Sequence, residues 1–156
     1  MEVKVLFVCL GNICRSPLAE GVLLELIKDA ELEDKIKVDS AGTSAYHIGE
    51  LADYRTRQTA QQHGIQLTHR ARQVQKEDFQ LFDYILAADK SNYNNLKALQ
   101  SEHDKAILHL IRDWEGKNLE VPDPYYGTLK DFEDGYQMLK KALKPFLEHL
   151  RAYHGI

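Results

Sequence analysis

Cys9 and Arg15 are separated by five residues in the segment Cys9-Leu-Gly-Asn-Ile-Cys-Arg15. Five intervening residues are enough to curl once around a tetrahedral oxyanion, with several backbone N–H groups directed inwards. Gly11 and Asn12 are residue types that tolerate the positive φ that such a curl needs. Arg15 can bind two oxygens of the anion through a bidentate pair of hydrogen bonds. The segment therefore predicts an anion site with a thiol at its base.

The thiol of Cys9 gives this anion site a chemical use. Inward N–H groups and the positive end of a following helix favour the thiolate form of a cysteine. A thiolate below a bound phosphate is positioned for in-line attack on phosphorus, which gives a covalent phospho-cysteine that water then resolves. The spacing Cys-x5-Arg alone is a weak signal, since buried cysteines and surface arginines are common. The Gly-Asn pair inside the segment and Ser16-Pro17 at its end favour a phosphate site over a purely structural loop.

The pattern around this segment predicts a strand, a loop and a helix in succession. Residues 3–8 form a short apolar run rich in β-branched side chains, which is typical of a buried parallel strand. From Pro17 onwards the apolar residues recur at a helical spacing. Proline suits the first turn of a helix, and Ser16 is the expected N-cap. A helix that starts here directs unsatisfied N–H groups at the loop.

Strand and helix patterns alternate along the rest of the chain. We expect further strands at residues 36–38, 82–87 and 106–111, a helix at residues 52–63, and another that follows Asp89 and runs to about residue 99. This alternation predicts an α/β fold in a single domain over residues 1–156, with a four-stranded parallel sheet flanked by helices on both faces. The carboxyl ends of parallel strands share one edge, so the segments carrying Ser40, Asp89 and Asp123 should open beside the first loop.

A long C-terminal helix is predicted by six apolar side chains spaced alternately four and three residues apart: Phe132, Tyr136, Leu139, Leu143, Phe146 and Leu150. Pro145 lies inside this pattern. An interior proline removes a backbone hydrogen bond at a cost of about 3 kcal/mol. We therefore expect Pro145 to kink or split the helix.

Composition and charge exclude several classes of protein. The formal net charge of −4, without an evident basic face, disfavours a nucleic-acid partner. No apolar run is long enough to span a bilayer and no targeting segment is evident, so we expect a cytoplasmic protein without a membrane partner. Cys9 and Cys14 lie together in the first loop, unlike the cysteines of a disulfide-stapled secreted domain. Two thiols without a nearby His pair cannot form a closed zinc site, so no metal is expected.

Several motifs occur in the order found in one enzyme family. The segment Val8-Cys-Leu-Gly-Asn-Ile-Cys-Arg-Ser-Pro17 resembles the signature loop of the low-molecular-weight protein tyrosine phosphatases, and Val121-Pro-Asp-Pro-Tyr-Tyr-Gly127 resembles their acid loop. Matches to the family's pattern also occur at Val38-Asp-Ser-Ala-Gly42, at Gly64-Ile65 with His69-Arg-Ala-Arg72, and at Phe82-Asp-Tyr-Ile85. The resemblance covers nearly the full length of the chain. It implies a hydrolase that acts on phosphotyrosine and small aryl phosphates and uses no cofactor.

The resemblance assigns the reaction to three side chains. Cys9 would be the nucleophile, Arg15 would bind phosphate and the transition state, and Asp123 would be general acid and then general base. The residues alone identify Asp123 only as a turn residue between two prolines. The implied phosphate-binding loop comprises Leu10, Gly11, Asn12, Ile13, Cys14, Arg15 and Ser16.

Supporting groups around the loop are implied in the same way. The side chains expected to brace it are those of Asn12, Ser16, Ser40 and His69, and the expected aromatic pocket walls are Tyr46, Tyr125 and Tyr126. A deep aromatic slot suits an aryl phosphate and leaves phosphoserine too short to reach the thiolate. Cys14 would lie beside the nucleophile, where a disulfide with Cys9 would switch activity off reversibly and prevent irreversible oxidation. Asp89 receives no role.

Two other functions remain open at this point. An arsenate reductase on the same fold has a similar loop but relays a disulfide to further cysteines, and this chain has no cysteine after Cys14. A silent phosphate- or phosphotyrosine-binding module would not need Cys9, Arg15 and Asp123 together. The expected partners are phosphotyrosine-containing proteins or small aryl phosphates, and the expected assembly is a monomer or a weak homo-oligomer.

Overall fold

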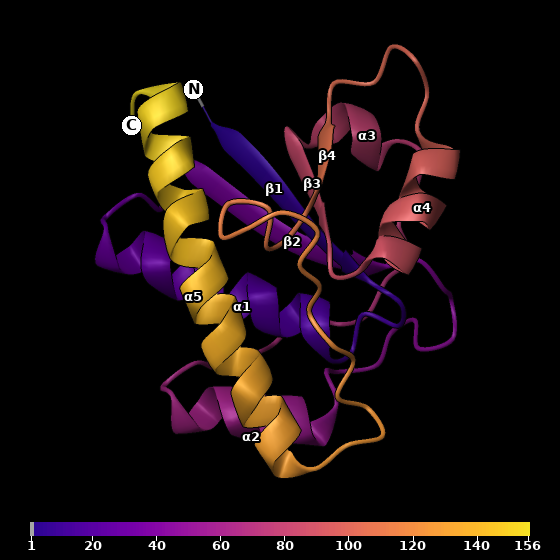
Figure 1. Cartoon of the computed structure of the whole chain (residues 1–156), viewed down its shortest axis with the longest axis vertical. Coiled ribbons are helices and arrows are strands. Elements are labelled where there is room, and N and C mark those ends of the chain that lie inside the picture. Colours follow the sequence, from indigo (N-terminus) through magenta and orange to yellow (C-terminus); the bar gives the residue numbers. More distant parts are fainter. Residues whose placement is uncertain (1) are drawn as a thin grey trace.

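The computed structural model describes residues 2–156. Its elements in chain order (Figure 1) are β1 (Val3–Cys9), α1 (Arg15–Asp29), β2 (Ile36–Gly42), α2 (Tyr54–Gln62), α3 (Asp78–Leu81), β3 (Tyr84–Ala87), α4 (Lys90–Leu99), β4 (Ile107–Leu110) and α5 (Leu129–His154). The short helix α3 was not predicted from the sequence, and β2 extends further towards its carboxyl end than the predicted strand at residues 36–38.

The strands form one parallel four-stranded sheet in the order β2-β1-β3-β4. β1 lies inside the sheet, where Val5 pairs with Val38 of β2 and with Tyr84 of β3. Both faces of β1 are covered, which explains why all its residues except Lys4 are apolar. The predicted α/β fold with a four-stranded parallel sheet is confirmed.

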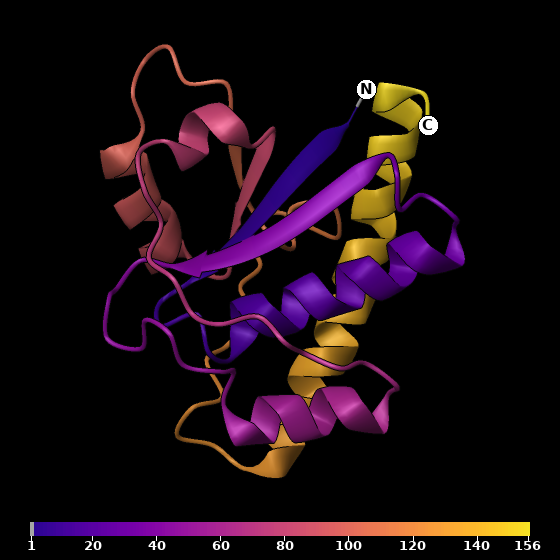
Figure 2. The same cartoon turned by 180° about the vertical axis from the view of Figure 1, so that it is seen from behind.

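Side chains of β1 alternate between two hydrophobic cores, one on each face of the sheet. Val3, Val5 and Phe7 pack with residues of α1 and α5, while Leu6 and Val8 pack with residues of α3 and α4. Figure 1 and Figure 2 show the same division from opposite sides, with α1 and α5 on one face and α3 and α4 on the other. The expected helical layers on both faces are therefore present, and α2 packs against α1 and α5.

We expected Pro145 to kink or split the last helix; α5 runs through Pro145 without a break, so the split does not occur. The predicted apolar face of this helix is buried, at Phe132, Tyr136, Leu139, Leu143, Phe146 and Leu150. Burying one such side chain contributes about 1.5–3 kcal/mol. Several together exceed the cost of about 3 kcal/mol for an interior proline, so the helix continues past it.

The helix α1 begins at Arg15, and its N-cap is Cys14, without a side-chain capping hydrogen bond. The predicted N-cap role of Ser16 is therefore wrong. Ser16 lies in the first turn, and its hydroxyl contacts Cys9 and Asn12 instead of a free N–H of the helix. Tertiary contacts therefore occupy the Ser16 hydroxyl, which the local sequence pattern assigned to capping the helix.

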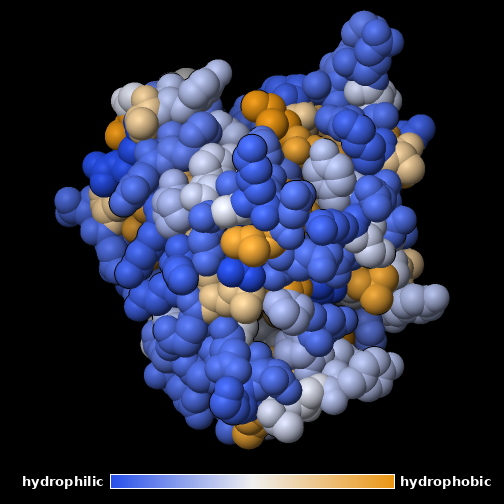
Figure 3. All heavy atoms as spheres, viewed as in Figure 1, coloured by the Kyte–Doolittle hydropathy of each residue, from blue (hydrophilic) through white to orange (hydrophobic). Residues whose placement is uncertain are grey.

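Within residues 2–156, none of the helices has both the length and the apolar character needed to cross a bilayer. The face seen in Figure 3 is mostly hydrophilic, with hydrophobic residues in small, separate patches.

Replacing Pro145 with alanine restores a backbone N–H inside α5 and is expected to stabilise the protein. Alanine is about 3 kcal/mol better than proline in a helix interior, and the greater freedom of the unfolded chain offsets less than about 1 kcal/mol. We expect Pro145→Ala to raise the free energy of unfolding by about 2 kcal/mol, measured by urea denaturation. Lys144→Ala, at an exposed neighbouring position, should stay within about 0.5 kcal/mol of wild type. A less stable Pro145→Ala protein would contradict this account of α5.

Candidate active site

The loop between β1 and α1 takes a left-handed turn at Asn12, whose φ is 57°. Asparagine tolerates this conformation better than most residues. Gly11 has no positive φ; its missing side chain makes room for His47, whose ring carbon would lie 3.0 Å from an added Cβ. Gly42 at the end of β2 lies closer still to the loop, with the backbone oxygen of Leu10 at 2.8 Å from an added Cβ. The loop is therefore packed directly against neighbouring segments of the same chain, at His47 and Gly42.

The side-chain amide of Asn12 connects three parts of the chain. Its nitrogen donates to the hydroxyls of Ser16 at 2.7 Å and Ser40 at 3.0 Å. Its oxygen accepts from the backbone N–H of Arg72 at 3.0 Å and from Nε2 of His69 at 2.8 Å. All four hydrogen-bonding positions of the amide are used. Ser16, Ser40 and His69, which were expected to brace the loop together with Asn12, all hydrogen-bond to the Asn12 amide.

The sulfur of Cys9 lies at the end of β1 and is buried. The hydroxyl of Ser16 lies 3.0 Å from it, and the backbone N–H of Ser16 donates to it at 3.4 Å. The hydroxyl proton of Ser16 has two acceptors within reach, this sulfur and the backbone oxygen of Ala41 at 3.4 Å. The backbone N–H and the hydroxyl of Ser16 therefore both face the sulfur of Cys9.

The guanidinium of Arg15 is buried and extends to the carboxyl ends of the strands. Its Nη1 donates to Oδ2 of Asp89 at 2.6 Å and to the backbone oxygen of Val121 at 3.0 Å. Its Nη2 lies 3.8 Å from Oδ2 of Asp123. Burial alone would lower the pKa of Arg15, but the negative groups around it, Cys9 first and Asp89 next, hold that pKa above its ordinary value.

Asp89 has two structural tasks that sequence reasoning did not assign. One carboxylate oxygen accepts from Arg15, and the other accepts from the N–H of Asn92 in the first turn of α4. The partner Arg15 lies 74 residues away in the chain, so no local pattern indicates the pair. The available signal was the position of a carboxylate directly after a buried strand.

A cavity of about 300 Å³ lies over the loop and is lined by Cys9, Arg15 and Asp123 together with all three predicted wall residues, Tyr46, Tyr125 and Tyr126. Tyr46 and Tyr126 are 84% and 96% exposed. Tyr125 is held more firmly, with its ring against Tyr126 at 4.9 Å and the guanidinium carbon of Arg55 at 5.5 Å. Ser44 and His47 also line this cavity, although no motif or spacing in the sequence pointed to them.

Cys14 lines the same cavity as Cys9 but has a different environment. Burial first, and then the negative charge of Asp53, raise the pKa of Cys14 to about 12. Cys14 is therefore a protonated thiol at neutral pH. Both cysteines are free.

A second group of polar side chains lies behind the loop, outside this cavity. Ser40 donates its hydroxyl hydrogen to Glu20 at 2.6 Å, and burial raises the pKa of Glu20 to about 7. Burial also lowers the pKa of His69. In the part of the chain that the structure describes, the one group of side chains close enough to share a metal ion is Glu20, Asp39 and His69.

Comparisons with known proteins identify relatives over almost the whole chain. A family model described as "Low molecular weight phosphotyrosine protein phosphatase" matches residues 4–154. A protein of that name from Gallus gallus is 50% identical over 151 residues, covering 94% of this chain and 96% of the relative. The Homo sapiens protein of that name is 48% identical over 148 residues, covering 93% and 94%. The crystal structure of an Entamoeba histolytica protein tyrosine phosphatase, with Hepes in its active site, is 40% identical, has a TM-score of 0.91 and covers 99% of each chain.

Gly42→Ala is expected to displace the loop, because an added Cβ would lie 2.8 Å from the backbone oxygen of Leu10. We expect at least about tenfold weaker binding of inorganic phosphate, which is about 1.4 kcal/mol, measured by isothermal titration calorimetry. Gly135→Ala in α5 is the matched control, since an added Cβ there meets no atom within 4 Å. Unchanged phosphate affinity in Gly42→Ala would show that the loop does not need this close approach.

Proposed function

Because this chain belongs to the low molecular weight phosphotyrosine protein phosphatase family, we propose that Cys9, Arg15 and Asp123 carry out its reaction. The activity itself, that of a protein tyrosine phosphatase, a hydrolase, follows from the family. The assignment of the three residues is supported by one observation above all: their side chains line a single cavity over the loop.

In the first step, the phosphate group occupies the loop, with its oxygens facing backbone N–H groups and the guanidinium of Arg15. The Cys9 thiolate attacks phosphorus; an S–P bond forms and the bond from phosphorus to the phenolic oxygen breaks. Arg15 is already held by Asp89 and by the backbone oxygen of Val121. Little further ordering of the guanidinium is then needed in the transition state.

The departing phenolic oxygen requires a proton, and protonated Asp123 supplies it. In the second step the ionised Asp123 takes a proton from water while the water oxygen attacks phosphorus. The S–P bond breaks, which releases phosphate and restores the Cys9 thiolate. The position of Asp123 at the cavity supports this role, with one oxygen 3.8 Å from Arg15 and the other accepting from the Tyr125 N–H at 3.1 Å.

The aromatic walls support phosphotyrosine-containing proteins or small aryl phosphates as substrates. The faces of Tyr46, Tyr125 and Tyr126 offer contact area to a substrate ring. Phosphoserine lacks such a ring and has a shorter side chain. We propose a monomer or a weak homo-oligomer that acts in the cytoplasm, where a nucleophilic thiol stays reduced.

Asp123→Asn tests the proton donor through its dependence on the leaving group. The substitution should lower kcat for phenyl phosphate by about 10²- to 10⁴-fold. The loss should be much smaller for p-nitrophenyl phosphate, because nitrophenolate departs without a proton. Single-turnover kinetics with both substrates measure the difference. Equal losses would argue against Asp123 as the acid.

Control variants separate this function from its alternatives. Cys9→Ser and Arg15→Ala should abolish turnover of both substrates, whereas Asp134→Asn, an exposed carboxylate on α5, should retain wild-type rates. Hydrolysis by the wild type excludes a silent binding module. Undiminished turnover by Cys9→Ser would overturn the covalent mechanism.

We also propose that Cys14 resolves an oxidised Cys9. Peroxide converts the Cys9 thiolate to a sulfenic acid; the Cys14 sulfur then attacks, an S–S bond forms and water leaves. The proposal is supported by the presence of both thiols at one cavity. With its pKa raised to about 12, Cys14 is mostly protonated at neutral pH. At pH values below this pKa, each increase of one pH unit raises the reactive thiolate fraction of Cys14 about tenfold.

After inactivation by peroxide, the wild type should regain most of its starting activity when treated with dithiothreitol. Cys14→Ser should regain little of its own, because unprotected Cys9 proceeds to irreversible oxidation. Mass spectrometry after a fixed exposure to peroxide should find more Cys9–Cys14 disulfide at about pH 8 than at about pH 7. Equal recovery of the two proteins would refute the role of Cys14.

A further inference from the structure

The flanking groove is a second cavity, of about 450 Å³, that adjoins the active-site cavity. The two cavities share Ile13, His47 and Tyr125 in their linings. The lining of the flanking groove also includes two arginines, Arg57 of α2 and Arg70 of the segment between α2 and α3. A long substrate whose phosphate lies in the loop can therefore extend into this groove.

Both arginine side chains are anchored at one edge by backbone carbonyl groups. Nε of Arg57 donates to the backbone oxygen of Ala52 at 2.9 Å, and Nη1 of Arg70 donates to the backbone oxygen of Gly49 at 2.8 Å. The guanidinium carbon of Arg57 also lies 5.7 Å from the ring centroid of Tyr54. A side chain that is already anchored loses less conformational freedom when it binds a ligand.

The backbone that supplies these carbonyl groups is itself held in place. The N–H of Gly49 donates to the oxygen of Ala71 at 2.8 Å, and the N–H of Ala71 donates to the oxygen of Glu50 at 2.8 Å. Leu51 and Arg70 form an antiparallel bridge between the same two segments. The positions of the two guanidinium groups are thus set by paired backbone segments.

Most N–H groups of the two guanidiniums have no partner within the protein. Within residues 2–156, each guanidinium donates to one acceptor, its backbone carbonyl, and neither is paired with a carboxylate. Nη1 and Nη2 of Arg57 and Nε and Nη2 of Arg70 therefore keep N–H groups for a ligand. Arg70 is exposed and Arg57 is half-buried, so a ligand can reach both. Such planar pairs of donors match the two oxygens of a carboxylate.

The carboxylates that line the flanking groove have other partners. Asp53 accepts from Nε and Nη2 of Arg55, each at 3.0 Å, and this contact is the main cause that lowers the pKa of Asp53. Glu50 lies 3.0 Å from Nδ1 of His47. Among the lining residues, Glu50 alone then opposes the two groove arginines. The groove therefore carries an excess of positive charge.

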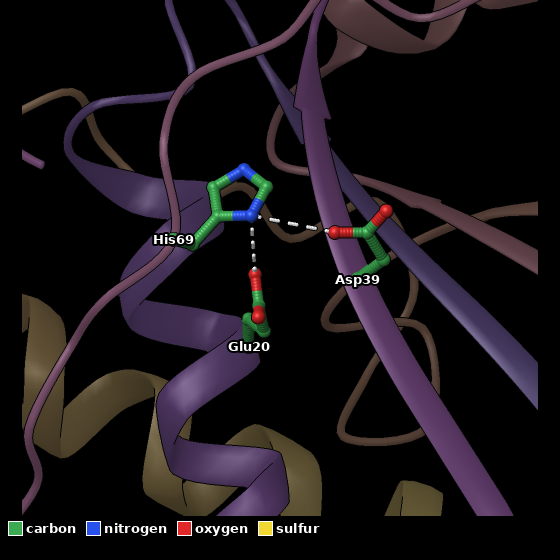
Figure 4. Close-up of side chains that lie close together, drawn as sticks. All are labelled: Glu20, Asp39 and His69. Atoms are coloured by element: carbon green, nitrogen blue, oxygen red, sulfur yellow. Dashed lines mark ion pairs between the residues drawn. The ribbon is translucent and has the colours of Figure 1, made fainter. Parts of the chain in front are cut away.

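Arg70 is separate from the polar group behind the loop, although it follows His69 in the chain. Nδ1 of His69 lies 3.4 Å from Asp39 and 3.6 Å from Glu20 (Figure 4). Arg70 instead contacts the backbone of Gly49. Glu20 and Asp39 do not line the flanking groove, so a ligand in the groove does not meet their carboxylates.

We propose that the flanking groove binds an acidic side chain from the residues that flank the phosphotyrosine of a protein substrate. Arg57 and Arg70 receive its carboxylate, while the phosphate of the same substrate lies in the loop. The inference rests on the proposed function, because it needs that phosphate in place. It favours phosphotyrosine-containing proteins over small aryl phosphates, which have no flanking residues. The two arginines determine specificity and do not touch the reacting atoms.

Three phosphotyrosine peptides of equal length test the groove, with Glu, Gln or Lys at the three positions on each side of the phosphotyrosine. For the wild type, kcat/KM should be about fivefold higher for the Glu peptide than for the Gln peptide, and lowest for the Lys peptide. This order is opposite to the effect of the protein's formal net charge of −4. The differences should shrink between about 50 mM and about 500 mM NaCl, because salt screens exposed charges.

Two double variants change the charge of the groove. Arg57→Gln/Arg70→Gln should reduce the preference for the Glu peptide over the Gln peptide to less than about twofold. Arg57→Glu/Arg70→Glu should reverse the order, so that the Lys peptide becomes the best substrate, a result that loss of structure does not produce. Arg151→Gln is the matched control, because Arg151 is exposed near the other end of α5; it should keep the wild-type order.

Hydrolysis of p-nitrophenyl phosphate separates this inference from the proposed function. That substrate has no flanking residues, so the wild type and all three variants should hydrolyse it at the same rate. If the wild type hydrolyses it but does not distinguish the Glu and Gln peptides, the groove proposal is wrong and the proposed function stands. An unchanged order of peptides in both double variants would also overturn the groove proposal. A wild type that hydrolyses neither p-nitrophenyl phosphate nor the peptides would overturn the proposed function, and this inference with it.

Discussion

The left-handed conformation of Asn12 is the constraint on which the site depends. Such a conformation costs energy and persists only where the surroundings hold it. Here one amide makes four hydrogen bonds, to α1, to β2 and to the segment before α3. Ser16, which this amide holds, in turn faces the sulfur of Cys9. The loop between β1 and α1 is therefore kept in shape by groups from distant parts of the chain.

The architecture could be predicted from the sequence because local patterns determine it. The apolar run of β1 and the alternation of strands with helices led to the correct sheet. Two of the differences from the sequence-based expectations have a common cause. Ser16 does not cap its helix because Cys9 and Asn12 use its hydroxyl. Pro145 does not split α5 because buried apolar side chains on the same helix outweigh it. In both places tertiary contacts override a local preference.

Separation along the chain limited how much of the site could be predicted. Cys9 and Arg15 lie at the two ends of one short loop, so their spacing alone indicated an anion site. Asp123 could be selected only through resemblance to a family. Asp89 reaches Arg15 across 74 residues, and the backbone of Arg72 reaches Asn12 across 60. No periodicity or motif spacing encodes such contacts, because they arise only when the sheet edges come together.

The rim and the base of the active-site cavity differ in how much of the structure depends on them. Tyr46 and Tyr126 are 84% and 96% exposed, and surface substitutions of this kind usually change stability by less than about 0.5 kcal/mol. At the base, the side chains of Asn12 and Arg15 make several hydrogen bonds to other parts of the chain. The side chains at the rim can therefore change, in evolution or by design, with little effect on the structure of the loop at the base of the cavity.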